Sequence, residues 1–110
     1  MAKRAAGWRA ALLAPLVTLA AGAWAGDPAA GRQQAVQCAA CHGADGIAIL
    51  PEAPNLAGQN ETYLVKAMKD FKSGARKNEM VSLIAEKLSE KDIADLAAHF
   101  HGLELMVHKK

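Results

Sequence analysis

The sequence predicts an all-α fold. Its clearest local signals start or end helices, and alternating strand patterns are nearly absent from the 110 residues. After residue 25 the only aromatic side chains are Tyr63, Phe71 and Phe100. A domain this small and poor in aromatic residues usually needs a disulfide, a metal or a bound cofactor to complete its core. We therefore expect one small helical domain whose interior contains a non-peptide group.

The first 25 residues are expected to lie outside this domain. They begin with three basic residues and no acid, continue with an apolar run over residues 10–21, and end in Ala23-Trp24-Ala25. This order is typical of a secretory signal peptide that is cleaved after Ala25. The apolar run is short for a transmembrane helix, although a retained N-terminal anchor is the alternative.

Removal of this segment changes the charge of the protein. The whole chain has 13 Lys and Arg and 11 Asp and Glu, a net charge of +2. Three of the basic residues precede residue 26 and all the acids follow it, which leaves −1 for residues 26–110. No basic stripe with interleaved aromatic residues remains, so no nucleic-acid partner is expected. We divide the chain into a signal peptide (1–25) and one folded domain (26–110).

The first helix is expected to begin at the Asp27-Pro28 pair, an N-cap followed by the residue that favours the first helical position. It runs to the cysteine pair Cys38 and Cys41, with Gly31 as an unexplained helical glycine. Residues 43–59 are rich in Gly and Pro and predict a loop that is long for so small a domain.

Three further segments follow this loop. Asn60 is the expected N-cap of a helix with an apolar stripe, which ends at Gly74. A basic turn leads to a short apolar-faced segment, and the Ser89-x-x-Asp92 capping box opens a last helix that ends at Gly102. Residues 103–110 form a tail. The stripe of the middle helix consists of Tyr63, Leu64, Ala67, Met68 and Phe71.

The motif Cys38-Ala-Ala-Cys41-His42 is compatible with several chemistries. A redox dithiol needs a strand-rich context, zinc needs a fourth ligand and a better spacing, and a disulfide leaves His42 and the long loop unexplained. Covalent haem accounts for all of these features, because two thiols at this spacing add to its two vinyl groups and the next residue binds the iron. We predict one haem c attached to Cys38 and Cys41, with His42 as an axial ligand.

The second axial ligand is expected to be Met80. It begins the short segment after the basic turn, where a loop could cover the far face of the haem, and no apolar stripe requires a methionine there. The other candidates have simpler explanations, namely packing in the core, partial exposure on the last helix, or a place in the tail (Met68; His99 and His101; Met106 and His108).

Five stretches of the sequence together resemble the class I c-type cytochromes: CAACHGADG, PNLAGQ, YLVKAMKDFKSGAR, Met80 and LSEKDIADLAAHF. The similarity spans residues 27–103 and is strongest to short bacterial periplasmic monohaem cytochromes and to one half of the dihaem type. It implies a small cytochrome c fold, three main helices plus a short one wrapped around the haem. It also implies that Gly31 lets the first helix cross the last near Phe100. In the haem pocket, the Pro54 carbonyl would accept the Nδ1–H of His42, and Leu56 would pack on the proximal side.

The function expected from this resemblance is that of a periplasmic electron carrier rather than an enzyme. With His42 and Met80 on the iron, no coordination position stays open for a substrate. The expected donor is a quinol-oxidising complex or a dehydrogenase, and the acceptor a terminal oxidase or reductase. The mature protein is not expected to be embedded in a membrane. The alternatives are a haem subunit of a larger periplasmic oxidoreductase and a ligand-binding haem protein or enzyme in which Met80 is displaced.

Overall fold

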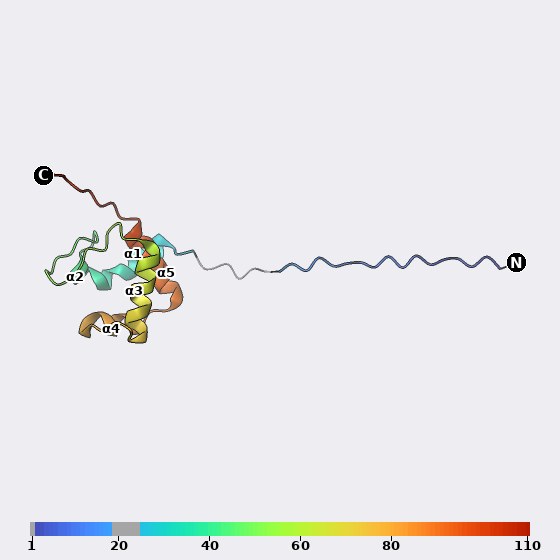
Figure 1. Cartoon of the computed structure of the whole chain (residues 1–110), viewed down its shortest axis with the longest axis horizontal. Helices are drawn as coiled ribbons and strands as arrows, with labels where there is room; N and C mark the ends of the chain where they lie inside the picture. The colour runs from blue at the N-terminus through green and yellow to red at the C-terminus, as the bar shows by residue number, and fades with distance from the viewer. Residues whose placement is uncertain (1, 19–24) are drawn as a thin grey trace.

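The computed structural model describes residues 2–18 and 25–110, and it confirms the all-helical fold. The described residues contain no strand. Three short helical segments, α1, η1 and α2, follow one another without a gap and form the predicted first helix. Helices α3 and α5 are the other two main helices, and α4 is the short one (Figure 1). The bounds are α1 Pro28–Gln34, the 3₁₀ turn η1 Ala35–Cys38, α2 Ala39–His42, α3 Glu61–Ser73, α4 Glu79–Glu86 and α5 Glu90–His101.

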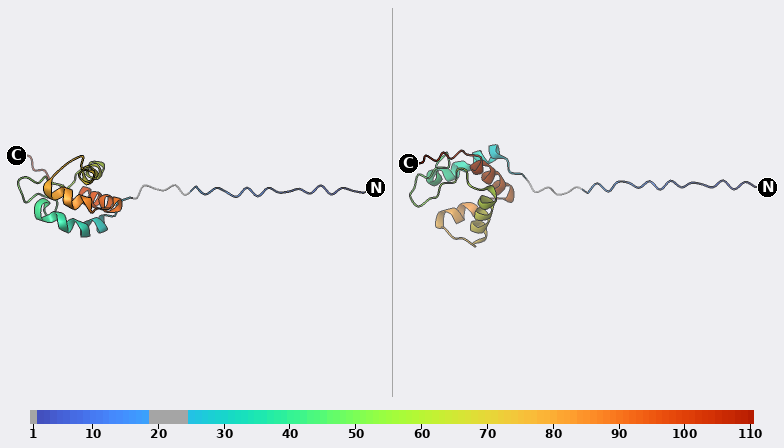
Figure 2. Two further views of the ribbon diagram at one scale, coloured as in Figure 1. Left: turned by 90° about the horizontal axis from the view of Figure 1, so that it is seen from below. Right: turned by 45° about the horizontal axis from the view of Figure 1, so that its top comes forward.

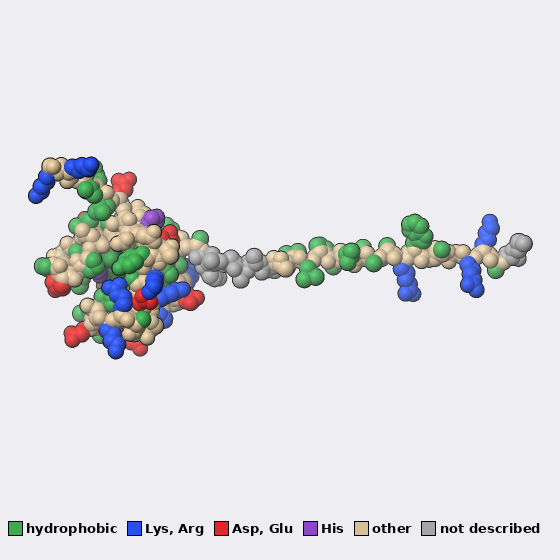
Figure 3. Space-filling view, viewed as in Figure 1, with side chains coloured by type: hydrophobic (Ala, Val, Ile, Leu, Met, Phe, Trp, Pro, Cys, Tyr) green, Lys and Arg blue, Asp and Glu red, His purple; other side chains and the backbone are tan. Residues whose placement is uncertain are grey.

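Residues 2–18 contain no helix or strand, and their apolar side chains are exposed, among them Trp8, Leu12 and Leu16. In Figure 3 hydrophobic and basic side chains stand apart on this extended stretch. Ala23 and Trp24 of the expected cleavage motif lie outside the described residues. Among the helices that the structure describes, none is long and apolar enough to cross a membrane.

The first helical segment begins as predicted and tightens in its middle. The Asp27 side chain accepts a hydrogen bond from the Ala29 backbone N–H at 2.9 Å, and Pro28 is the first helical residue. A 3₁₀ turn then replaces the continuous α-helix that we expected before the cysteines. The segment ends at Gly43, whose φ of +78° suits a residue without a Cβ.

Gly31 sits where α1 crosses α5. A Cβ at this position would lie 2.0 Å from the carbonyl oxygen of Asp95 and 2.9 Å from the Cβ of His99. The glycine therefore has the packing role that the resemblance implied, next to Phe100. Two hydrogen bonds also join α1 to α5, from the Asp27 N–H to Asp95 Oδ1 at 2.8 Å and from the Gln34 side chain to Asp92. Both panels of Figure 2 show these helices packed together.

Helix α3 begins at its predicted N-cap, since the Asn60 side chain accepts from the Tyr63 N–H at 2.9 Å, and ends at Gly74. Leu64 is buried and Met68 packs against the core, as expected from the stripe. Tyr63 is 51% exposed, so its place in the buried stripe was wrong. The buried core combines residues of η1, α3 and α5 with Leu88, which lies just before α5. Its members are Ala35, Leu64, Leu88, Ile93, Leu96, Ala97 and Phe100.

The segment that carries Met80 is a helix rather than a loop. Asn78 caps α4, and its side chain accepts from the N–H groups of Met80 and Val81 at 3.0 Å each. Met80 thus lies in the first turn of α4, where a capped helix, not a mobile loop, sets its backbone. Downstream, Ser89 and Asp92 form the predicted capping box of α5.

Candidate functional site

The two cysteines lie on one helical turn. Cys38 ends η1 and Cys41 lies in α2, and residues three apart on a helix are neighbours on its surface. Both thiols are free and half-buried. Cys38 also packs against the core, and its burial, followed by the neighbouring Cys41, raises the pKa of the Cys38 thiol. The structure thus places two thiols side by side.

The imidazole of His42 is held by the long loop. Its Nδ1 lies 2.8 Å from the carbonyl oxygen of Pro54. Because a carbonyl oxygen can only accept, this hydrogen bond places the proton on Nδ1 and leaves Nε2 as the ring's lone-pair donor. The same arrangement orients imidazole ligands in many metal sites.

Backbone hydrogen bonds fasten the loop of residues 43–59 to the cysteine-bearing turn. The N–H groups of Ile49 and Leu50 donate to the Cys41 carbonyl at 2.9 and 3.3 Å. Farther along, the N–H groups of Leu56 and Ala57 donate to the Gly46 carbonyl at 2.8 and 3.0 Å. Leu56 is partly buried and packs against the core. The loop is therefore held in an ordered conformation beside α2 by its own backbone hydrogen bonds.

Met80 and His42 lie on different helices, α4 and α2. Helix α4 packs on α3, whereas α2 has its extensive contacts with η1. Met80 is 61% exposed. The structure thus brings together Cys38, Cys41, His42 and Pro54, and leaves Met80 on a separate helix.

The remaining candidate ligands fall in three kinds of environment. Met68 packs against the core, as predicted, and Met106 is exposed in the tail. His101 is exposed, and its Nδ1–H donates to the Gln59 carbonyl at 2.7 Å. His99 was expected to be partly exposed, and this was wrong: it is 8% exposed, with its ring 4.9 Å from the ring of Phe100.

The burial of His99 follows from its position at the α1–α5 crossing, where Gly31 allows the backbones to approach closely. Burial, and to a lesser degree the nearby Arg32, lowers the pKa of His99. Sequence spacing alone did not reveal His99 as a core residue. Both His99 and His101 adjoin Phe100 in the chain, and the spacing does not tell which of the two histidines is buried.

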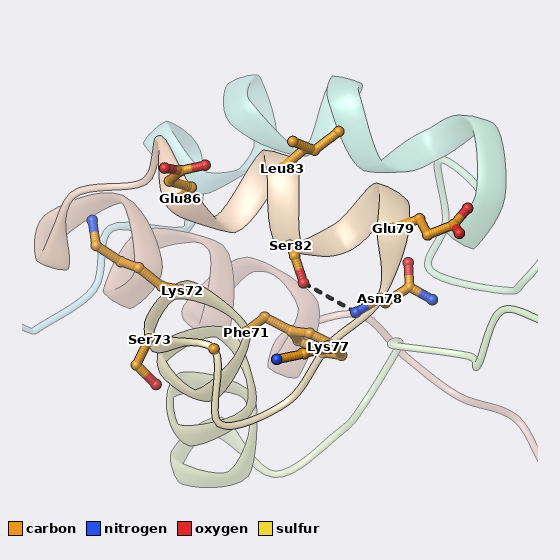
Figure 4. Close-up of a pocket in the computed structure, with 10 residues that line it drawn as sticks. Phe71, Lys72, Ser73, Lys77, Asn78, Glu79, Ser82, Leu83 and Glu86 are labelled. Carbon is orange, nitrogen blue, oxygen red and sulfur yellow. Dashed lines mark hydrogen bonds between the residues drawn. The ribbon is translucent and has the colours of Figure 1, made fainter.

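A hollow of about 700 Å³ lies between the C-terminal end of α3 and α4 (Figure 4). Phe71 and Lys72 line it from α3, and Ser82 and Leu83 from α4. The Asn78 N–H donates to Ser82 Oγ at 3.0 Å along its edge. The cysteines and His42 do not line this hollow, so it is distinct from the attachment turn.

These residues fit a covalently attached haem. Two free thiols share one helical turn, and the adjacent imidazole has its Nδ1 occupied and its Nε2 available as an iron ligand. An all-helical small domain with this attachment turn defines a c-type haem protein.

The chain belongs to the cytochrome c family, whose family model matches residues 28–104. It carries one covalent haem c at Cys38 and Cys41. The family is one of electron carriers rather than enzymes.

Known relatives agree with this assignment. The chain is similar to cytochrome c-554(548) of Halomonas halodenitrificans, with 45% identity over 83 residues that cover 73% of this chain and 100% of the relative. It is also similar to cytochrome c4 of Pseudomonas aeruginosa, with 47% identity over 83 residues that cover 76% of this chain and 41% of the relative.

A solved structure supports the fold. Reduced recombinant cytochrome c4 from Pseudomonas stutzeri superposes with a TM-score of 0.69 at 38% identity, covering 73% of this chain and 47% of that one. The chain thus spans less than half the length of the cytochromes c4 that it matches.

Proposed function

We propose that this protein is an exported, periplasmic one-electron carrier whose haem iron is bound by His42 and Met80. The observation that carries the proposal is the 2.8 Å contact between His42 Nδ1 and the Pro54 carbonyl oxygen, beside two free thiols. It supports a His42 ring with its Nε2 available to the iron. Bound haem supplies a reversible one-electron change at its iron.

Each residue has a separate task in this proposal. Cys38 and Cys41 tether the haem, and His42 binds the iron on the proximal side. The Pro54 carbonyl holds the His42 ring in one orientation and raises its basicity as a ligand. Leu56 packs on the proximal side, where an apolar neighbour limits the access of water.

Met80 supplies the second axial ligand from the first turn of α4. Thioether ligation favours the ferrous iron and raises the reduction potential of the haem. With both axial positions taken, electrons pass without a substrate bound to the iron. The proposed donor is a quinol-oxidising complex or a dehydrogenase, and the acceptor a terminal oxidase or reductase.

The absorption spectrum of the ferric protein tests the ligand pair. We expect a weak red band typical of sulfur-bound ferric haem, and its loss in Met80→Ala. Met106→Ala is the matched control, because Met106 is 75% exposed in the tail, and this variant should keep the band. Persistence of the band in Met80→Ala would overturn the proposed ligand.

The second candidate is a ligand-binding haem protein in which Met80 is displaced from the iron. Carbon monoxide separates the two functions. The carrier should bind carbon monoxide slowly or not at all at neutral pH in its ferrous form, whereas rapid binding by the wild-type protein identifies a ligand-binding protein.

Export is tested on the protein purified from the periplasm. The basic, apolar and small-residue order of the first 25 residues supports cleavage after Ala25. Intact-mass measurement should therefore give residues 26–110 plus one haem. A mass that includes residues 1–25 would show a retained N-terminal anchor instead.

A further inference from the structure

Helix α4 has one face packed in the domain and another that is open. Ala85 and, just beyond the helix, Leu88 are buried at 2% and 5% exposure. Met80 and Leu83 are both 61% exposed. Because they are three residues apart, these two side chains are neighbours on the helix surface. The short helix thus presents an apolar pair that no described element of the protein covers.

The environment of Leu83 is visible in Figure 4. Leu83 borders the hollow between α3 and α4, but in this view its side chain stands on the side of α4 opposite to Phe71 of α3, and the ribbon of the α1–α2 segment is drawn beyond it. Two acids, Glu79 and Glu86, flank it on α4 and are themselves exposed. A single exposed leucine is ordinary, but Leu83 lies beside the equally exposed Met80, and this apolar pair becomes buried only where a further group covers both side chains.

We infer that Leu83 is a positioning residue for the axial bond: it packs on the haem face that Met80 covers and keeps water away from the bond between the Met80 sulfur and the iron. The inference rests on the proposed function, because it takes Met80 as the axial ligand. The occupant of this open apolar face is the haem that the two cysteines hold, since covalent attachment keeps it within the same domain.

The physical reason is competition at the iron. A thioether is a weak ligand, and water or an added base takes its place once it reaches the iron. An apolar side chain beside the bond limits that access and lowers the local dielectric constant. Leu83 fits this task because it is one helical turn from Met80, on the same helix, so α4 delivers the ligand and its cover together.

Imidazole binding to the ferric holoprotein tests the inference. In Leu83→Ala, imidazole should displace Met80 with about tenfold higher affinity than in the wild type, the order expected for losing most of a leucine's apolar contact. Leu83→Ile keeps the volume and should restore the wild-type affinity to within about threefold. Leu105→Ala is the matched control, because Leu105 is a 50% exposed leucine of the C-terminal tail, and it should bind imidazole as the wild type does.

The outcomes separate this inference from the proposed function. If Leu83→Ala and the wild type bind imidazole equally while Met80→Ala has lost the red band, Met80 is the ligand and the role of Leu83 is overturned. If the wild type already lacks the red band, the axial pair itself is wrong. An equal increase of imidazole affinity in Leu83→Ala and Leu105→Ala would also overturn the inference, because a general loosening of the protein would then explain both increases. Leu83 is largely exposed, so the alanine variant should keep its fold, which circular dichroism checks.

Discussion

Gly31 and His99 meet where α1 crosses α5, and the space between them depends on a missing side chain. A Cβ on residue 31 would stand 2.0 Å from a backbone oxygen of Asp95, which cannot swing aside as a flexible side chain could. The same approach buries His99 beside Phe100. This crossing positions the cysteine-bearing turn, because α1 continues through η1 into α2.

Gly31→Ala should therefore lower the free energy of unfolding. In a free helix this change stabilises by about 1 kcal/mol, but overpacking against a fixed backbone atom costs about 1–3 kcal/mol, and we expect the second effect to win. Denaturant unfolding measures the difference. The control is Gly102→Ala, where the nearest atom to the new Cβ is 3.3 Å away. A Gly31→Ala protein as stable as the wild type would contradict the close contact.

His99 should make the stability depend on pH. Burial and then Arg32 lower its pKa, so below about pH 6.5 the unfolded chain binds more protons than the folded protein. The stabilisation is complete above that pH and is lost as the pH falls toward the folded-state pKa, with a slope of at most about 1.4 kcal/mol per pH unit.

Unfolding of the wild type at pH of about 7.5 and 5.5 measures this loss. The His99→Phe variant should not lose stability between these two pH values, whereas His108→Asn, in the exposed tail, should lose as much as the wild type. Arg32 faces His99 from α1, and Asp92 and Asp95 on α5 have lowered pKa values, so those carboxylates titrate below this window. An unchanged pH dependence in His99→Phe would mean that another group titrates.

Among the elements, α4 is the one that stands most apart. It is eight residues long, and its packing partner is α3. Its N-terminal N–H groups depend on Asn78, whose side chain accepts from Met80 and Val81. The proposed ligand therefore sits in the turn that this cap holds in place.

Asn78→Ala should loosen α4 before the rest of the protein. Loss of an N-cap costs about 1 kcal/mol. Because the cost falls on the first turn, the red absorption band should disappear at a lower denaturant concentration than the helical circular dichroism signal. In Asn60→Ala, which removes the cap of α3, the two transitions should stay together. Coincident transitions in Asn78→Ala would show that α4 unfolds only with the whole domain.

At the scale of the whole molecule, charge is unevenly distributed. Five basic residues gather on α3 and the turn after it, and Figure 3 shows basic side chains clustered there. We call this set the α3 basic face, and it consists of Lys66, Lys69, Lys72, Arg76 and Lys77. Three of the five have partners within the protein: Lys66 pairs with Asp70, Lys72 donates to the Leu88 carbonyl, and Arg76 lies 4.5 Å from the centre of the Phe71 ring.

We expect the α3 basic face to be a solvated surface rather than a docking patch, because most of its charges already have partners. The double variant Lys69→Gln with Lys77→Gln should change the bimolecular rate of electron exchange with a purified redox partner by less than about threefold at low salt. Stopped-flow absorption of the haem measures this rate. A tenfold loss that disappears at high salt would instead identify a patch that steers an acidic partner.

What the sequence could predict was mostly local. The caps at Asp27, Asn60 and Ser89 and the spacing of the cysteines and His42 are interactions within one or two helical turns, so their residues lie next to one another in the chain. The resemblance then extended this reading to the Pro54 carbonyl, which does lie within hydrogen-bond distance of His42. The start and end of the loop were predicted because Gly and Pro exclude regular helix.

By itself, then, the sequence determined the helical class, the order of the helices and the turn that holds the haem. Only the tertiary structure decided that His99 is buried, that Tyr63 is not, and that Met80 stands in the first turn of a capped helix. The physical reason is that a cap is satisfied by neighbours in the chain, whereas burial depends on which helix crosses which and how closely. At the α1–α5 crossing that distance is set by Gly31, whose effect reaches a histidine 68 positions farther along the chain.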